Sequence, residues 1–174
     1  MGEGYSVVVL DPPWLEQGGG KVKRGADRHY PLMKTAEIEQ LLVGDWAIPE
    51  KMADPSVCFL WVTNNFLPDG LHVMEAIGFR YVTNLVWAKD RFGLGYYFRG
   101  QHELCLFGVK GKWGRPQGTS STLLGGAQLP RRKHSQKPDE LAEMIERRFD
   151  GRYLELFARR ERDGWDCMGN EVGE

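Results

Sequence analysis

A chain of 174 residues is the length of one domain with a single core, so we expect residues 1–174 to form one domain. Hydrophobic residues make up 41% and charged residues 27%, and no segment reaches the ~18 consecutive apolar residues that a membrane span requires. A net charge of -1 excludes a uniformly basic nucleic-acid binder. Residues 1–90 nevertheless carry 8 basic and 12 acidic side chains, and residues 91–174 carry 15 and 12. The second half can therefore hold a basic patch that contacts phosphates.

The three cysteines are widely separated and form no Cys-x-x-Cys pair. A disulfide framework and a zinc site are both unexpected, and a reducing cytoplasm is the expected location. The four histidines are scattered as well, so the sequence offers no metal site and no Ser-His-Asp or Cys-His pair.

The first structural element of the chain is the apolar run 7–10, which three valines and a leucine mark as a buried strand. Pro12 and Pro13 end that strand, because neither residue can donate a hydrogen bond to a neighbouring strand. Asp11 and Trp14 are thereby left at the carboxyl end of a strand, where open α/β sheets bind their ligands.

The four residues Asp11, Pro12, Pro13 and Trp14 suit the activation of an exocyclic amine on adenine. That nitrogen is a poor nucleophile because its lone pair is delocalised into the ring. Asp11 can accept one amine hydrogen and the Pro12 carbonyl the other, while Trp14 stacks on the base. The bland alternative, an ordinary strand-ending turn, fits these residues equally well. The functional interpretation requires Asp11 to face a cavity.

Farther along, Gly18 to Gly25 form a basic, glycine-rich loop that lacks the spacing of a phosphate-binding P-loop, and we expect a mobile active-site loop there. Thr35 is expected to cap a helix with one apolar face at Ile38, Leu41 and Leu42. Residues 57–62 are expected to be a buried strand, and residues 81–87 a third strand. Between them, a helix starting at Pro68 and ending at Gly78 has Leu71, Met74 and Ile77 at the inner spacing.

Residues 92–99 combine glycine, aromatic residues and an arginine, a composition that suits stacking on splayed bases and suits a buried aromatic cluster equally. A strand at 102–109 and a long loop at 110–132 follow. Lys137-Pro138 opens a helix with an apolar stripe, and 152–157 is the last strand expected. The alternation of strands and helices predicts a mostly parallel sheet with helices on both faces and right-handed crossovers.

Several segments of the chain occur in the order found in one family. The segments are Asp11-Pro12-Pro13-Trp14, Tyr30-Pro31-Leu32-Met33, Phe59-Leu60-Trp61-Val62-Thr63, Glu103 to Gly111, Lys137-Pro138-Asp139-Glu140, Glu155-Leu156-Phe157-Ala158-Arg159 and Gly169-Asn170-Glu171. Their order resembles the family that contains the catalytic subunit of the eukaryotic mRNA adenosine methyltransferase, together with bacterial and phage relatives.

The resemblance implies a Rossmann-like class I methyltransferase fold with a permuted motif order and S-adenosyl-L-methionine as the cofactor. It implies that Asp11 lies between the cofactor and the target amine, and that Pro12 and Pro13 shape the pocket while Trp14 and Tyr30 flank the base. The implied cofactor contacts are Asp11, His102, Arg159, Arg160, Glu161, Arg162, Asn170 and Glu171. The basic run Arg131, Arg132 and Lys133 is expected to contact substrate phosphates.

The chain also departs from the eukaryotic pattern. His102 stands where the resemblance implies a lysine facing the cofactor carboxylate, and a neutral histidine supplies less charge there. The residues after Arg159 differ from Pro-His-Asn. Only ten residues precede Asp11, so an upstream acidic residue that contacts the cofactor's adenine has no counterpart. We therefore expect weak cofactor binding or a pocket completed by a partner subunit or a second copy.

Three hypotheses remain at the level of sequence. The first is methyl transfer to the N6 amine of adenine in DNA, by in-line attack of the amine on the sulfonium methyl group. The second is the same reaction on RNA. The third is a catalytically inactive nucleic-acid-binding partner, although such a partner is expected to lose the Asp-Pro-Pro-Trp motif that this chain keeps.

Overall fold

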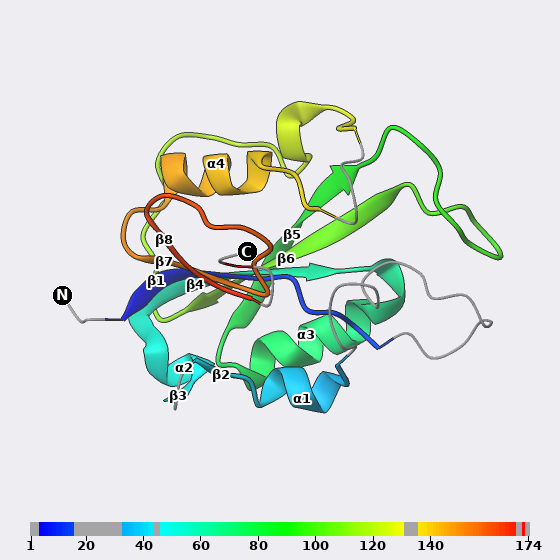
Figure 1. Cartoon of the computed structure of the whole chain (residues 1–174). Helices are drawn as coiled ribbons and strands as arrows, with labels where there is room; N and C mark the ends of the chain where they lie inside the picture. Colours follow the sequence, from blue (N-terminus) through cyan, green and yellow to red (C-terminus); the bar gives the residue numbers. More distant parts are fainter. Residues whose placement is uncertain (1–3, 16–32, 44–45, 131–135, 170–171, 173–174) are drawn as a thin grey trace.

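The computed structural model describes residues 4–15, 33–43, 46–130, 136–169 and 172. A six-stranded sheet forms its centre, in the spatial order β5-β6-β4-β1-β7-β8 (Figure 1). The strands are β1 (Tyr5–Leu10), β4 (Met52–Val62), β5 (Arg80–Ala88), β6 (His102–Lys110), β7 (Tyr153–Leu156) and β8 (Trp165–Met168). A separate two-stranded ribbon pairs β2 (Leu42–Val43) with β3 (Trp46–Ala47).

Helices cover both faces of the sheet, as Figure 1 shows. On one face lie α1 (Thr35–Glu39) and α3 (Leu67–Ala76), with α2 (Ile48–Lys51) beside them. On the other face lies α4 (Glu140–Arg148), together with a short 3-10 turn at Leu124–Gly126. Another 3-10 turn, Asn64–Phe66, leads from β4 into α3. Within the described ranges, no helix has both the length and the apolar character needed to cross a membrane.

Alternation along the strands divides the apolar residues into two cores, one on each face of the sheet. In β1, Val8 and Leu10 pack toward α3, whereas Val7 and Val9 pack toward α4. Because both faces are covered, the central strands are apolar throughout, as the unbroken run of valines in β1 predicts. The predicted stripe of α4 is buried as expected, at Leu141, Met144, Ile145 and Phe149.

The sheet is mostly parallel, as predicted, with one strand reversed. β1 runs parallel to β4 and β7, and β7 runs parallel to β8. β6 is antiparallel to both β4 and β5. The expectation that strands alternate with helices throughout is wrong here, because a hairpin at residues 89–101 joins β5 to β6 without a helix. The sequence also did not predict β8, in which polar and charged residues interrupt the apolar ones and which follows β7 without a helix.

Two local predictions for the helices are also corrected. The N-cap of α1 is Lys34, whose backbone N–H donates to the Glu37 carboxylate at 2.6 Å. Thr35 is instead the first helical residue, and its hydroxyl donates to Asp69 of α3 at 2.9 Å. On α3 the buried side chains are Val73 and Met74, whereas Leu71 is exposed. Met74 and Ile77 are therefore buried as predicted, and Leu71 is the one predicted inner residue that is exposed, with Val73 buried instead.

The order of the strands determines where a ligand can bind. The chain leaves β1 toward β4 on one side and returns to β7 on the other, so the carboxyl end of β1 lies at the switch point of the sheet. Ligands of open α/β sheets bind at that point. Asp11 is the first residue beyond β1.

Candidate active site

A cavity of about 320 Å³ opens at the carboxyl ends of β1, β4 and β7, a volume within the range of small-molecule sites. Its remaining walls come from the segment that leads into α4, from the turn after β7, and from β8. The lining residues are Val9, Asp11, Trp61, Gln136, Lys137, Pro138, Asp139, Leu141, Ala142, Glu155, Phe157, Arg159, Arg160, Arg162 and Trp165.

Strand register explains why the floor of the cavity combines acids with aromatic rings. Val9 is paired with Phe59 on one side and with Glu155 on the other. Two residues further along each strand, side chains return to the same face of the sheet. That step brings Asp11 between Trp61 and Phe157, and all three line the cavity, although Phe157 also packs against the core on the α3 side.

Lys137 connects this floor to a row of buried charges. Its Nζ lies 3.1 Å from Oδ1 of Asp11 and 3.1 Å from Oε2 of Glu103. Glu103 in turn accepts from Lys89 Nζ at 2.6 Å. Lys137 precedes a proline, which favours an extended backbone, and it therefore lies before α4 instead of inside it. Two carboxylates and two ammonium groups thus alternate from β1 to β5.

The electrostatic state of these groups follows from burial and from their neighbours. Burial raises the pKa of Asp11, and the Lys137 ammonium opposes that rise without cancelling it. Burial also acts to raise the pKa of Glu103, but Lys137 and Lys89 outweigh it and hold the pKa at about 2. Burial acts to lower the pKa of Lys137, and the two carboxylates raise it above its ordinary value. Lys137 and Glu103 are therefore charged at neutral pH.

Backbone hydrogen bonds fix the Asp-Pro-Pro-Trp motif in place. The Pro13 carbonyl accepts from the Met33 N–H at 2.8 Å, and the Met33 carbonyl accepts from the Leu15 N–H at 3.0 Å. The Pro12 carbonyl accepts from the Trp14 N–H at 3.0 Å. A carbonyl oxygen has two lone pairs, so this contact does not use the full acceptor capacity of Pro12. Pro12 and Pro13 are buried and are not among the residues that line the cavity.

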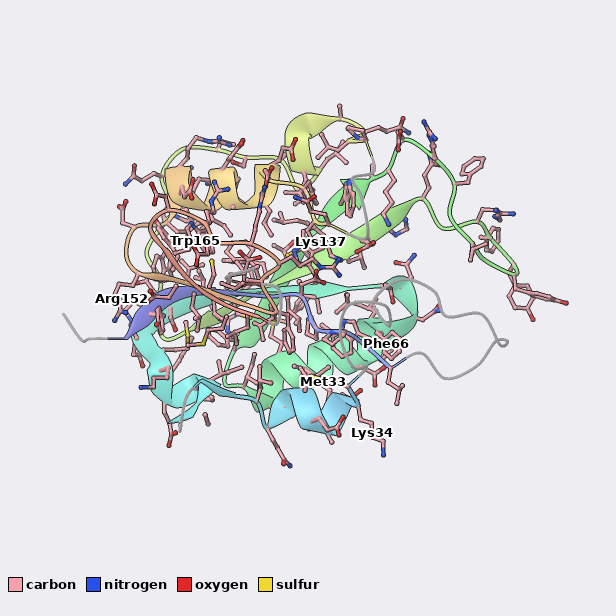
Figure 2. All side chains as sticks on the ribbon, in the orientation of Figure 1. Met33, Lys34, Phe66, Lys137, Arg152 and Trp165 are labelled. Carbon is pink, nitrogen blue, oxygen red and sulfur yellow. The ribbon has the colours of Figure 1, made fainter. Side chains whose placement is uncertain are left out.

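Trp14 lies on the α3 side of the sheet, away from the cavity. Its ring stacks on Phe66 with centroids 5.4 Å apart, and its indole N–H donates to the Trp61 carbonyl at 3.0 Å. Figure 2 shows Phe66 and Met33 on the α3 side, whereas Lys137 and Trp165 lie on the α4 side. The ring is buried, and the structure does not bring it to the cavity that Asp11 lines. Its contacts here hold the motif to the end of β4.

The end of β7 contributes a carboxyl group and a strained backbone. Burial raises the pKa of Glu155 to about 7, and the nearby Asp11 charge adds to the rise. Phe157 has a φ of 63°, the left-handed conformation that a bulky side chain rarely adopts. This turn aims the chain back across the cavity toward Arg159, and strain of this kind clusters at functional sites.

Three of the predicted cofactor contacts after β7 line the cavity, namely Arg159, Arg160 and Arg162. Arg160 forms an ion pair with Asp139 at the start of α4. Arg162 donates to both oxygens of Glu146 on α4, at 2.7 and 2.9 Å. Glu161 is exposed and lines an acidic groove beside the cavity instead.

The structure does not bring His102 to the cavity. His102 and Glu103 are consecutive residues of β6, so their side chains point to opposite faces of the sheet. Glu103 faces Lys137, and His102 is exposed. The other predicted contacts lie outside the described residues: Tyr30, Arg131, Arg132, Lys133, Asn170 and Glu171.

Sequence reasoning assigned no site role to several residues that the structure brings together. Lys137, Glu103 and Glu155 are the charged ones, and Trp61 and Trp165 the aromatic ones. A signal was present for the two acids, since each interrupts an apolar strand that packs on both faces. An ionisable residue in such a strand is rarely buried without a partner.

Comparison with known proteins agrees with this geometry. The family model MT-A70 matches residues 5–171. The chain is similar to the Type II methyltransferase M.MunI of Mycoplasma sp, with 31% identity over 97% of this chain and 78% of the relative. It is also similar to the N(6)-adenosine-methyltransferase MT-A70-like protein of Arabidopsis thaliana, with 31% identity over 24% of that protein. The human N(6)-adenosine-methyltransferase catalytic subunit METTL3 is 30% identical over 28% of its length.

The chain therefore spans most of M.MunI but only about a quarter of these two eukaryotic relatives. The family match covers β1 with its carboxylate, the walls of the cavity and the end of the sheet. The chain belongs to the MT-A70 family of S-adenosylmethionine-dependent adenine N6-methyltransferases.

Proposed function

We propose that this chain transfers a methyl group from S-adenosyl-L-methionine to the N6 amine of adenine in DNA. The observation that carries the proposal is the position of Asp11, which directly follows β1, lines the cavity and lies 3.1 Å from a buried ammonium. An ordinary strand-ending turn would not need a buried cation beside its carboxylate.

The lining of the cavity fits the cofactor by its chemistry. S-Adenosylmethionine carries a carboxylate, an ammonium, ribose hydroxyls and an adenine ring, and when bound it supplies an electrophilic methyl group on a sulfonium centre. Lys137 and Arg159 are cations suited to the carboxylate, and Glu155 is an acceptor suited to the ammonium or the hydroxyls. Trp165 and Leu141 offer apolar surface for the adenine ring. Each part of the cofactor thus has a matching group on the wall.

Asp11 and Pro12 are proposed to act on the target amine. The Asp11 carboxylate accepts one N–H of the amine, and the second lone pair of the Pro12 carbonyl accepts the other. Both contacts pull the hydrogens out of the plane of the base and leave the nitrogen lone pair directed at the methyl carbon. Positioning and fixed dipoles of this kind supply most of the rate in such a displacement.

Lys137 is proposed to keep Asp11 an acceptor. Burial raises the pKa of Asp11, and a protonated carboxyl group loses acceptor capacity at the oxygen that must receive the amine hydrogen. The ammonium at 3.1 Å favours the carboxylate. Lys137 in turn is held in its charged form by Asp11 and Glu103.

We propose DNA as the substrate because the chain matches 78% of M.MunI, whereas its match to the eukaryotic adenosine methyltransferases is confined to about a quarter of their length. RNA is the second candidate, because relatives of equal identity are named for adenosine. A duplex would have to release the adenine from its stack at a cost of a few kcal/mol, so single strands are the more favourable test substrate.

The experiment measures the transfer of labelled methyl groups to matched DNA and RNA oligonucleotides, single-stranded and duplex. Asp11→Asn keeps the size of the side chain and removes the charge, and we expect transfer to fall by about 10²–10³-fold. Asp150→Asn, at an exposed acid beyond α4, is the control and is expected to transfer at the parent rate. Equal rates for Asp11→Asn and the parent would refute the role of Asp11.

Calorimetry with the cofactor separates the remaining possibilities. Binding with transfer only to RNA would move the proposal to the second candidate. Failure of the pure chain to bind the cofactor would indicate that a partner subunit absent from the sample completes the pocket. Cofactor binding without transfer to either polymer would favour the inactive, nucleic-acid-binding subunit.

A further inference from the structure

The hairpin between β5 and β6 ends in a group of aromatic side chains that face solvent. Tyr96 is 96% exposed, Tyr97 89% and Phe98 90%, and Phe92 and Leu94 are each about two thirds exposed. Tyr96 and Tyr97 contact each other edge to face, with ring centroids 5.2 Å apart. These five residues are named here the aromatic tip, and the hairpin that carries them extends away from the sheet in Figure 1. The buried aromatic cluster that the sequence equally allowed is therefore excluded.

Such a tip is costly to keep in water. Five large apolar side chains that are exposed together usually mark a binding surface. Two hydrogen bonds join the arms of the hairpin below the tip. The Gly93 N–H donates to the Gly100 carbonyl at 2.6 Å, and the Arg99 guanidinium donates to the Gly93 carbonyl at 2.6 Å. The exposed rings thus project from a closed loop with a defined base.

The charge on the hairpin favours an anionic partner. Beyond Lys89, which is paired with Glu103 at the base, the basic residues of the hairpin are Arg91 and Arg99, and Asp90 is its one acidic residue. The Arg91 side chain is 81% exposed, with Asp90 at 3.5 Å. Aromatic rings flanked by arginine are the surface on which single-stranded nucleic acids stack, because each base offers a π face while arginine attracts the phosphates.

The hairpin leaves the sheet at the same edge as Asp11. β5 and β1 run in the same direction, so Ala88 and Asp11 both follow carboxyl ends of strands. The base of the hairpin is joined to the site by the ion pairs of Lys89 with Glu103 and of Glu103 with Lys137. Each arm has about six residues and reaches at most about 20 Å, so the tip lies several nucleotides from an adenine at Asp11.

We propose that the aromatic tip is a stacking platform for unpaired bases of the nucleic acid, beyond the target adenine. The inference rests on the proposed function, and it adds a second, sequence-tolerant contact that holds the strand while one adenine occupies the site. A second copy of this chain and a lipid surface are the other partners that an aromatic tip can have, and binding experiments distinguish them.

The primary experiment measures binding of fluorescein-labelled oligo(dT) to the full chain by anisotropy. This oligonucleotide has no adenine, so the readout does not depend on methyl transfer. We expect the parent to bind in a salt-dependent manner and the triple variant Tyr96→Ala/Tyr97→Ala/Phe98→Ala to bind at least about tenfold more weakly. Conservative replacement by Tyr96→Phe/Tyr97→Phe is expected to restore binding, because the rings stack without their hydroxyl groups.

A matched control removes an aromatic ring elsewhere. Tyr81→Ala deletes a ring that is 38% exposed at the opposite end of β5, and we expect it to bind oligo(dT) as the parent does. Absence of parent binding, or equal binding by the parent and the triple variant, would overturn the inference. Two further results would overturn it if the triple variant binds oligo(dT) as tightly as the parent does. The first is a parent that dissociates from dimer to monomer on dilution while the triple variant does not show this transition. The second is binding of the parent to phosphatidylcholine vesicles.

Photochemical crosslinking identifies the contact directly. An oligo(dT) that carries 5-iodouracil forms a covalent bond under near-ultraviolet light with an aromatic side chain stacked on it, with loss of iodide. Mass spectrometry of the parent should place the crosslinked peptide at residues 96–98. Crosslinks found only elsewhere would overturn the inference. Failed methyl transfer beside a crosslinked tip would refute the proposed function and leave the stacking platform intact.

Discussion

Lys137 Nζ lies 3.1 Å from Oδ1 of Asp11, although the two residues belong to opposite ends of the chain. The side chain of each is only 18% exposed, so the pair is shielded from the solvent that weakens surface ion pairs. Lys137 is equally close to Glu103, so its ammonium offsets the repulsion between the Asp11 and Glu103 carboxylates.

Lys137→Met removes that ammonium and leaves Asp11 and Glu103 facing each other. The pKa of Asp11, already raised by burial, rises further, so a higher pH is needed to ionise it. We expect the acid limb of the pH profile of methyl transfer to move to higher pH. We also expect about 3–5 kcal/mol of stability to be lost at neutral pH, and less in acid, where the carboxylates are neutral.

Transfer rates and urea unfolding across pH check both effects. Lys137→Arg is the matched control because it keeps the charge, and its acid limb is expected to stay near that of the parent. An unchanged pH profile in Lys137→Met would contradict the assigned effect on Asp11 even if the variant were less stable.

Glu155 gives the folding stability of the parent its own pH dependence, and this group destabilises the folded state at high pH. Its pKa in the folded chain is about 7 because of burial, against an ordinary value of 4.5. The folded state therefore retains the proton longer than the unfolded chain does. The stability that this group contributes is present below pH 4.5 and is lost as the pH rises through about 7.

Glu155→Gln removes this dependence. Below pH 4.5 the parent and the variant should have similar stability, whereas at pH 8 the variant should be the more stable, by about 3 kcal/mol at most. Urea unfolding of both proteins at pH 4.5 and pH 8 tests the difference. A parent that is the more stable of the two at pH 8 would show that Glu155 is held as a carboxylate.

Much of the fold was predictable, because local sequence patterns specify its individual strands and helices. The valines of β1, the prolines after it and the stripe of α4 each specify one element and its buried face. The site was less predictable, because the contact of Lys137 with Asp11 and Glu103 depends on which strands become neighbours. The order β6-β4-β1 is a property of the whole sheet, and the sequences of the three strands do not specify it.

His102 and Glu103 show how small the missing information can be. Both belong to the same predicted strand, and a shift of one residue exchanges the face toward which each points. The register of β6, with His102 opposite Ala88 and Glu103 opposite Trp87, decides the matter. The resemblance implied a role for His102, whereas the structure turns its neighbour Glu103 toward Lys137.

Glu146 of α4 holds β8 against the helix, and its removal should loosen one wall of the cavity. It accepts from Arg162 at 2.7 and 2.9 Å and from the Trp165 indole at 2.8 Å. The hydrogen bond from Arg162 lowers the pKa of Glu146, so the stabilisation is present at neutral pH and lost as the pH falls. We expect Glu146→Gln to cost about 1 kcal/mol, because the pair is bidentate but partly exposed.

Thermal unfolding checks this value as a decrease of about 2–4 °C in Tm, reduced at high salt. The control is Asp166→Asn, which removes the partner of Arg152 from an ion pair more than half exposed on both sides. That variant should unfold within about 1 °C of the parent. Equal losses in the two variants would show that the bidentate geometry adds nothing.

Gly70 allows α3 to approach the sheet, and alanine there should destabilise the protein despite its better helix propensity. A Cβ on Gly70 would lie 2.4 Å from Cγ1 of Val62 and 3.1 Å from Cδ1 of Leu106, both in the buried core. Alanine gains about 1 kcal/mol over glycine within a helix, but overpacking costs about 1–3 kcal/mol. We expect a net loss of about 1 kcal/mol in urea unfolding.

The same argument specifies two further variants. Gly114→Ala places its Cβ where no atom lies within 4 Å, and it should leave the stability nearly unchanged. Val62→Ala removes the atom that Gly70→Ala would meet, so the double variant should be more stable than the sum of the single losses implies. Additive losses would mean that Val62 does not limit the approach, and that the backbone of α3 moves away instead.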